Sequence, residues 1–140
     1  MNFDPIPEHD MLRASVRQFF ERELPERTIR EWDQARKIPR TIWKRLAELG
    51  WMGISVPEEY GGSGGPAGDV MTAAVFVEEL CRKFPSMATD WLLTSMAART
   101  FREFGTPAQK AEYLPRIASG DFLMSFGMTE PSGGTDILGL

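Results

Sequence analysis

The fold is organised around one long, mainly apolar stretch, Val70-Met71-Thr72-Ala73-Ala74-Val75-Phe76-Val77-Glu78-Glu79-Leu80-Cys81-Arg82-Lys83-Phe84. Its apolar residues lie almost all the way round a helix, with Asp69 as a suitable N-cap and Pro85 as the stop. A helix that is apolar on nearly every side is surrounded by other elements. We therefore expect a central, buried helix in which Cys81 is a small buried hydrophobic residue rather than a reactive thiol.

Five more helices are predicted around this central one. Three precede it, over 8–24, over 26–37 with Pro25 in its first turn, and over 39–49, and two follow it, over 86–104 and 106–115. Gly50 is placed to end the third helix in a left-handed cap. Thr106-Pro107-Ala108-Gln109 combines a capping box with proline at the first helical position. Pro115 is expected to end the last helix.

The pattern of apolar residues changes after Gly120, from a helical period to a short continuous run. Phe122-Leu123-Met124-Ser125-Phe126-Gly127-Met128 is a short apolar run typical of a buried strand. A single strand cannot satisfy its own backbone hydrogen bonds, so it implies partners that these residues do not supply. We expect an all-α domain of about six helices over 1–120, and over 121–140 the start of a β domain at which the chain is cut off.

Length and composition exclude several classes of protein. A chain of 140 residues is about one domain, and 42% hydrophobic with 26% charged residues predicts a packed core. The formal charge of −4 disfavours a nucleic-acid partner. One cysteine and one histidine suggest no disulfide and no metal site, and the sequence shows neither a secretory signal nor a membrane span. We expect a cytoplasmic protein.

Two glycine-containing loops are candidate anion-binding sites, and only the second along the chain has a suitable set of donors. Residues 129–136 (Thr-Glu-Pro-Ser-Gly-Gly-Thr-Asp) gather three hydroxyls and two adjacent glycines after the predicted strand. Such a segment can hold a phosphate or pyrophosphate, or it can be a solvated turn, and both interpretations stay open. The earlier loop, 61–68, lacks the Gly-Lys-Ser/Thr of a P-loop and is interpreted as a hinge.

The remaining polar residues suggest no catalytic centre. The pairs Glu58-Glu59 and Glu78-Glu79 are sequence neighbours, which point in different directions on a helix, so they are interpreted as surface or capping charges. His9 has no candidate nucleophile nearby and receives no role. An apolar stripe at 86–104 is either core or the lining of an acyl pocket, and it consists of Met87, Trp91, Leu92 and Met96.

Several short segments, in this order, resemble the N-terminal part of the acyl-CoA dehydrogenase family. They are Ile38-Pro39, Leu46-Ala47-Glu48-Leu49-Gly50, Val56-Pro57-Glu58-Glu59-Tyr60-Gly61-Gly62, Glu78-Glu79-Leu80, Phe104-Gly105-Thr106, Gln109-Lys110, Tyr113-Leu114-Pro115, Ala118-Ser119-Gly120 and Met128-Thr129-Glu130-Pro131. The family usually continues Gly-Ala-Gly-Ser-Asp, where this chain has Ser132-Gly133-Gly134-Thr135-Asp136. The resemblance spans nearly the whole chain.

The resemblance implies a helical domain, a β-barrel and a C-terminal four-helix bundle, with FAD between barrel and bundle in a tetramer. It implies α,β-dehydrogenation of an acyl-CoA thioester, in which a glutamate takes the α-proton and flavin N5 takes a β-hydride. That glutamate belongs to the C-terminal bundle, so no catalytic residue is expected in this chain. An electron-transfer flavoprotein is the implied acceptor.

The resemblance also implies site residues. The cofactor-binding set is Phe126, Met128, Thr129, Gly134 and Thr135, with Thr129 bonded to the flavin ring and Thr135 near the pyrophosphate and the thioester arm of the substrate. The implied acyl-pocket residues are Leu92, Ser95 and Met96. Ser132-Gly133 replaces the usual Gly-Ala, which alters the loop.

Three functional hypotheses follow. The first is the N-terminal part of a flavin-dependent acyl-CoA dehydrogenase. The second is a different reaction on the same fold, acyl-CoA oxidation with oxygen or flavin-dependent monooxygenation. The third is a non-catalytic helical module that binds a partner.

Overall fold

The computed structural model describes residues 6–64, 70–136 and 138, and within them the fold is all-α, as predicted. The described helices are α1 (Pro7–Glu23), α2 (Glu26–Gln34), α3 (Arg40–Glu48), α4 (Val70–Lys83), α5 (Pro85–Phe104) and α6 (Pro107–Ala118), with two short 3-10 turns, η1 (Trp51–Gly53) and η2 (Glu58–Tyr60). Asp69, the expected cap of α4, lies outside the described residues.

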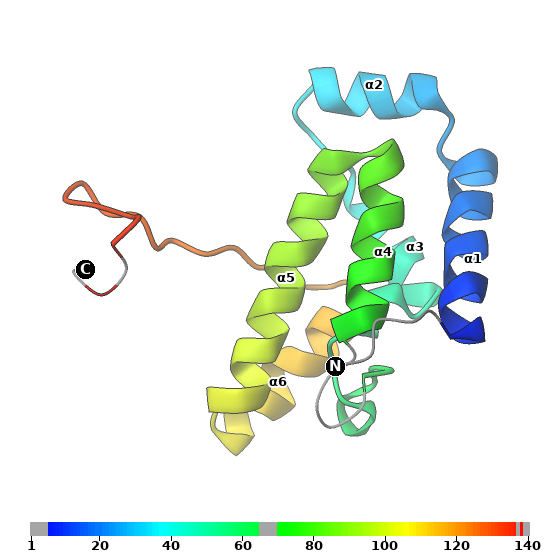
Figure 1. Ribbon diagram of the computed structural model, residues 1–140. Helices are drawn as coiled ribbons and strands as arrows, with labels where there is room; N and C mark the ends of the chain where they lie inside the picture. Colours follow the sequence, from blue (N-terminus) through cyan, green and yellow to red (C-terminus); the bar gives the residue numbers. More distant parts are fainter. Residues whose placement is uncertain (1–5, 65–69, 137, 139–140) are drawn as a thin grey trace.

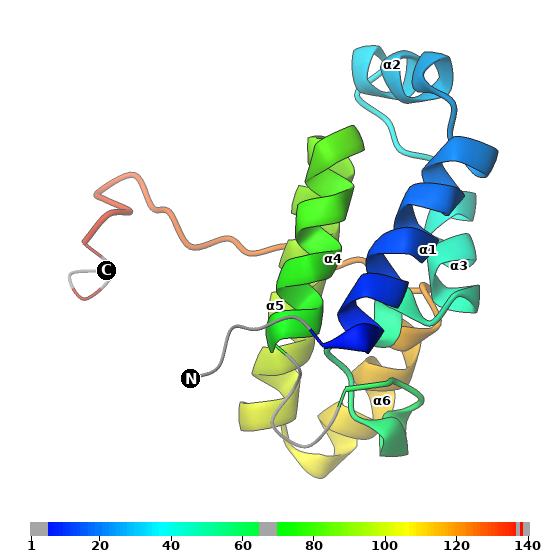
Figure 2. The ribbon, with the colours of Figure 1, turned by 45° about the vertical axis from the view of Figure 1, so that its right-hand side comes forward.

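Helix α4 lies between α1 and α5, and the three run side by side (Figures 1 and 2). Helix α6 packs against the C-terminal part of α5, and α2 crosses one end of the bundle (Figure 1). This arrangement gives the apolar α4 a neighbour on two sides, as its sequence requires.

The core is a chain of aromatic rings contributed by α1, η1, α4 and α5. The ring centroid of Trp51 lies 5.3 Å from that of Phe19 and 5.4 Å from that of Phe76, and Phe76 lies 4.8 Å from Trp91. The Trp91 indole donates a 3.0 Å hydrogen bond to the Trp51 carbonyl. The buried polar atom of the indole is therefore satisfied, and the rings can pack in a water-free interior.

Two predicted helix ends are confirmed. Gly50 follows α3 with φ +79°, in the left-handed region that favours glycine. At the start of α6, the Gln109 amide donates to Thr106 Oγ1 at 3.3 Å, and the Thr106 amide donates to Gln109 Oε1 at 2.9 Å. This reciprocal pair is the predicted capping box.

Other predicted boundaries are wrong. Helix α6 passes through Pro115 to Ala118, because the residues on both sides of the proline, Leu114 and Ile117, are fully buried and their burial outweighs one missing hydrogen bond. Pro25 is the N-cap of α2 rather than a residue of its first turn. That helix ends at Gln34 instead of residue 37, and Arg36 adopts φ +49°, which a helix cannot contain.

Helix α4 is not buried on every side. Val75, Phe76 and Leu80 are in the core, whereas Val70 is 57% exposed. Cys81 is also exposed, so its assignment as a buried hydrophobic residue is wrong. On the side that includes Val70, Ala73 and Val77, the apolar face of α4 lines a pocket that it shares with α5 instead of a closed core.

The predicted strand is absent from residues 122–128, whose backbone is extended and, beyond Met124, runs away from the helices (Figure 1). Two contacts anchor the start of this segment. Arg116 lies 3.6 Å from the centre of the Phe122 ring, and the Met124 amide donates to Thr94 Oγ1 at 3.1 Å. No described segment lies alongside to form a ladder, which is why the backbone is extended but unpaired.

Candidate functional site

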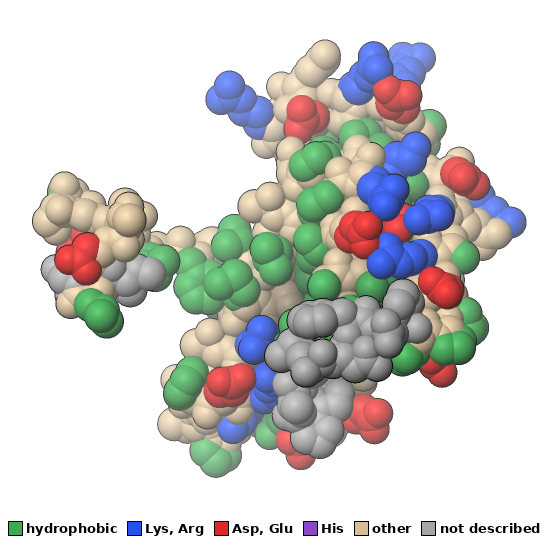
Figure 3. All heavy atoms as spheres, viewed as in Figure 1, with side chains coloured by type: hydrophobic (Ala, Val, Ile, Leu, Met, Phe, Trp, Pro, Cys, Tyr) green, Lys and Arg blue, Asp and Glu red, His purple; other side chains and the backbone are tan. Residues whose placement is uncertain are grey.

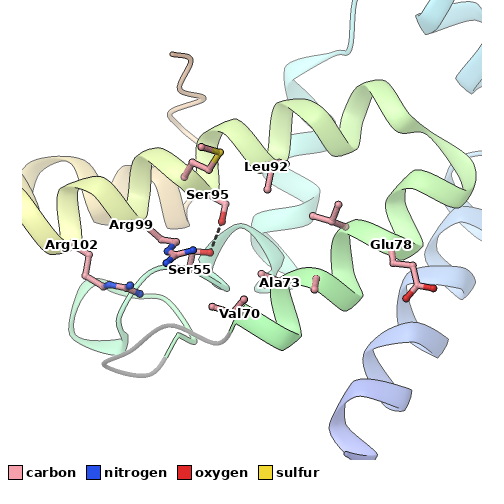
Figure 4. Close-up of a pocket in the computed structure, with 11 residues that line it drawn as sticks. Ser55, Val70, Ala73, Glu78, Leu92, Ser95, Arg99 and Arg102 are labelled. Atoms are coloured by element: carbon pink, nitrogen blue, oxygen red, sulfur yellow. Dashed lines mark hydrogen bonds between the residues drawn. The ribbon is translucent and has the colours of Figure 1, made fainter. Parts of the chain in front are cut away.

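A cavity of about 440 Å³ opens between α4 and α5 (Figure 4). Its lining consists of Ser55, Val70, Ala73, Ala74, Val77, Glu78, Leu92, Ser95, Met96, Arg99 and Arg102. The volume lies within the range of small-ligand sites, and the walls are mainly apolar with a few polar groups, as such sites require.

Helical spacing creates this cavity. On α5, Leu92, Ser95 and Met96 are three and four residues apart and therefore lie on one face. On α4, the facing residues include Ala73 and Ala74, whose side chains are too short to fill the space opposite. The cavity is thus a consequence of small residues on one helix and larger, separated ones on the other.

Some residues of the apolar stripe of α5 belong to the core and others line the cavity, which are the two interpretations that the sequence left open. Met87 and Trp91 are fully buried core residues. Leu92 and Met96 line the cavity and are 42% and 46% exposed. Ser95 also lines it and exchanges a hydrogen bond with Ser55, which is drawn as the dashed line in Figure 4.

Two arginines lie toward one end of the cavity. Arg99 and Arg102 follow Ser95 along the same face of α5 (Figure 4). Arg102 Nη2 donates to Glu103 at 3.0 Å, whereas Arg102 Nη1 is buried and has no hydrogen-bond partner in the described part of the chain. This end of the apolar cavity is therefore positively charged.

Glu78 lies at the other end of the cavity and is tied into a group of charges shared by α1 and α4 (Figure 4). Arg13 donates to Glu78 at 2.6 Å and to Glu79 at 3.1 Å, and Arg17 donates to both oxygens of Glu79 at 2.8 and 2.7 Å. Lys/Arg and Asp/Glu side chains gather over these helices in Figure 3. The group fixes α4 against α1.

The structure corrects the interpretation of Glu79 as a surface charge, because this residue is only 2% exposed. Hydrogen bonds from Arg17, and then from Arg13, hold the pKa of the Glu79 carboxyl below its ordinary value, although burial acts in the opposite direction. The pKa of Glu78 is also lowered, first by the Arg13 hydrogen bond. Both carboxyls are therefore favoured in their charged form by hydrogen bonds from arginine.

The predicted cofactor residues lie apart from this cavity, on the extended C-terminal segment. Phe126 and Met128 are 45% and 51% exposed, and Thr129 and Thr135 are exposed as well. A tight turn follows, in which the Glu130 amide donates to the Gly133 carbonyl at 2.9 Å and the reverse bond is 3.1 Å.

Gly134 lies against Thr129. A Cβ at position 134 would lie 2.9 Å from Thr129 Cγ2 and Oγ1, so only glycine fits without movement. Phe126, Thr129 and Thr135 are exposed residues that carry an aromatic ring and two hydroxyls, groups that can stack on a flavin and donate hydrogen bonds to it. They do not enclose a cofactor by themselves.

Sequence reasoning missed Ser55, Arg99 and Arg102. Arg99 and Arg102 continue the spacing of Ser95 along α5, and this spacing was the available signal. Ser55 lies in a segment with no helical period, so nothing in the sequence places it opposite Ser95.

None of the helices in the described ranges has both the length and the apolar character needed to cross a membrane. Within the same residues, no three His, Cys, Asp or Glu side chains are grouped so that they could hold a metal ion.

The fold and the cavity together define the class: an all-helical domain with an apolar, ligand-sized pocket between two antiparallel helices. Residues 6–121 match the family model described as "Acyl-CoA dehydrogenase, N-terminal domain". The chain belongs to this family.

Similar proteins agree with this assignment. A probable acyl-CoA dehydrogenase of Bacillus subtilis is 39% identical over 137 residues, which are 97% of this chain and 35% of that protein. The structure of a glutaryl-coenzyme A dehydrogenase in complex with glutaryl-CoA superimposes with a TM-score of 0.86 at 30% identity, covering all of this chain and 35% of that one. An acyl-CoA dehydrogenase of Bacillus anthracis complexed with FAD gives a TM-score of 0.72 at 31% identity, covering 98% and 23%. The chain thus spans about a third or less of the lengths that it matches.

Proposed function

We propose that this chain forms the N-terminal helical part of a flavin-dependent acyl-CoA dehydrogenase, and that the cavity between α4 and α5 receives the acyl chain. Family membership supports the class of enzyme. The observation that carries the assignment of the cavity is its shape: an apolar space between Ala73 and Ala74 on one side and Leu92 and Met96 on the other. A saturated hydrocarbon chain is the ligand that such walls bind, through burial of apolar surface.

In this proposal the chain supplies walls rather than reacting groups. Leu92 and Met96 hold the acyl chain in an extended, water-free path, and the catalytic base is a glutamate outside these residues. FAD, when bound, would accept a hydride from the β-carbon of the substrate, while the glutamate base takes the α-proton. An electron-transfer flavoprotein is the proposed acceptor of the electrons. The parent enzyme is proposed to be a homotetramer.

The reaction is tested in the complete enzyme by mixing it anaerobically with a series of saturated acyl-CoA esters. Loss of the absorbance of oxidised flavin, together with formation of the trans-2-enoyl-CoA, supports the proposal. Stoichiometric peroxide formation under air would instead favour the acyl-CoA oxidase alternative, and a hydroxylated product would favour a monooxygenase. A protein that takes up no flavin and reduces no acceptor would favour the non-catalytic module.

The cofactor residues are tested separately by two substitutions in the same enzyme. Thr129→Val is expected to weaken FAD binding by about ten- to a hundredfold, because it leaves a hydrogen-bonding flavin atom unpaired, at a cost of about 1–3 kcal/mol. Thr135→Ser keeps its hydroxyl and serves as the matched control. Equal losses in the two flavin dissociation constants would contradict the role of Thr129.

A further inference from the structure

The two arginines at one end of the cavity are not explained by an acyl chain that is apolar throughout. Arg102 has a side chain only 10% exposed, yet its Nη1 has no hydrogen-bond partner among the described residues. A buried guanidinium nitrogen without an acceptor is unfavourable. An anion entering the cavity would supply the missing acceptor.

Glu103 does not remove this excess of positive charge. Its carboxylate contacts Arg102 through Nη2 only, and the Glu103 side chain is 48% exposed to solvent. Arg99 lies one helical turn before Arg102 on the cavity wall and forms no ion pair in the described part of the chain. Two cationic side chains therefore face the cavity, and one carboxylate partly compensates them from outside.

The distribution of charge along the cavity gives the shape of the ligand. The walls between its ends are apolar, formed by residues such as Ala73, Val77 and Leu92. Glu78 at the far end is occupied by Arg13 and Arg82 and does not compete for the two arginines. A ligand that fits both parts has a hydrocarbon segment and a negative group attached to it.

We propose that Arg99 and Arg102 bind an anionic group at the end of an acyl chain, so that the pocket prefers ω-carboxyacyl thioesters to plain acyl thioesters of equal length. A planar guanidinium matches a carboxylate in size and hydrogen-bonding geometry. This inference rests on the proposed function, because it names the class of acyl group that the same cavity takes. The phosphates of coenzyme A are the other possible source of the anion, and the test separates the two.

The test is an NMR titration of the 140-residue chain carrying Phe104→Ser, following the Nε–Hε signals of arginine. This substitution lies outside the cavity lining and removes an 82% exposed ring, so that self-association is reduced. The probes are hexanoyl-CoA, adipoyl-CoA and the two corresponding pantetheine thioesters, which lack the nucleotide phosphates. We expect adipoyl thioesters to bind at least about tenfold more tightly than hexanoyl thioesters, with and without the nucleotide, and to shift the Arg99 and Arg102 signals.

Three variants complete the design. Arg102→Gln is expected to abolish the tenfold preference, and Arg102→Lys, which keeps the charge but loses the fork, is expected to retain part of it. Arg22→Gln changes the charge equally at an exposed arginine on α1 and should leave the preference unchanged. Far-ultraviolet circular dichroism verifies that each variant is folded.

Equal affinity for adipoyl and hexanoyl thioesters would overturn the inference. Binding that is lost when the nucleotide is removed would assign the arginines to the phosphates of coenzyme A and would also overturn it. Neither result bears on the dehydrogenation assay, which uses flavin reduction in the complete enzyme. Conversely, a clear carboxylate preference in a protein that does not reduce flavin would retain the binding site and reject the proposed reaction.

Discussion

Glu79 shows how a single residue can hold two helices together. Its carboxylate is nearly completely buried on α4, and two arginines of α1 donate three hydrogen bonds to it. A buried carboxylate is costly to desolvate and is tolerated only when charged donors surround it. Arg13 and Arg17 keep part of their surface in water, so α1 supplies the donors without burying three charges.

Glu79→Gln is expected to destabilise the domain by about 1–3 kcal/mol, because an amide cannot accept the same charged bonds and its NH2 group faces the arginines. Chemical denaturation measures this free energy of unfolding. Glu78→Gln is the matched control on the adjacent residue. Glu78 is half exposed, so we expect its loss to have a much smaller effect. Equal losses in the free energy of unfolding would mean that the burial of Glu79 does not make its ion pairs more stabilising than those of Glu78.

The lowered pKa of Glu79 predicts how stability depends on pH. Because the Arg17 and Arg13 bonds favour the charged form in the folded state, the stabilisation is complete above the unfolded pKa of about 4.3. It is lost as the pH falls through the lower folded pKa. Burial raises the pKa of Asp90, which therefore acts in the opposite direction. Melting temperatures from pH 7 to pH 3 should fall less steeply in Glu79→Gln than in the wild type.

At the scale of elements, the junction after α6 depends on one glycine. Gly120 has φ +69°, and a Cβ there would lie 2.6 Å from the Trp43 carbonyl oxygen of α3. Lys44 of the same helix pairs with the neighbouring Asp121, and Arg40 donates to the Asp121 carbonyl at 3.0 Å. The backbone approach at Gly120 thus fixes α3 against the end of α6.

Gly120→Ala is expected to destabilise the chain by about 2 kcal/mol or more, since it adds a left-handed alanine and a backbone clash. Gly127→Ala is the control, because a Cβ at that position would meet nothing within 4 Å. We expect the control to change stability by less than about 0.5 kcal/mol. Thermal denaturation measures the melting temperatures of both variants. Similar melting temperatures would contradict this account of the junction.

In the molecule as a whole, hydrophobic side chains gather along α5 where the C-terminal segment passes it (Figure 3). Met96, Phe104 and Phe126 line one hollow and are 46%, 82% and 45% exposed. Apolar residues grouped in this way mark surfaces that other protein parts cover. In the proposed parent enzyme those parts are the remaining domains.

The isolated chain is therefore expected to self-associate and to bind a hydrophobic dye. Phe104→Ser should reduce both, whereas Met11→Ser, which removes a 70% exposed side chain from α1, should change neither. Sedimentation velocity and dye fluorescence at equal molar concentration provide the measurements. A wild-type chain that stays monomeric and gives little dye fluorescence would show that the hollow causes neither self-association nor dye binding.

The helices, several of their ends and the family could be predicted from the sequence. Gly50 and the pair Thr106 and Gln109 act on neighbours within a few residues, so their effect can be predicted without a fold. The ordered motifs that carry the resemblance are likewise contiguous. The same local reasoning failed at Pro115, where burial of the flanking residues overrode the proline.

The three-dimensional packing, by contrast, set which faces of the helices are covered. It buried Glu79, exposed Cys81, and opened a cavity between α4 and α5 with Arg99 and Arg102 at one end. It also left residues 122–128 without a strand to pair with in the described part of the chain. Each of these outcomes depends on what lies opposite a residue across space, and helical period fixes the direction of a side chain but not its neighbour.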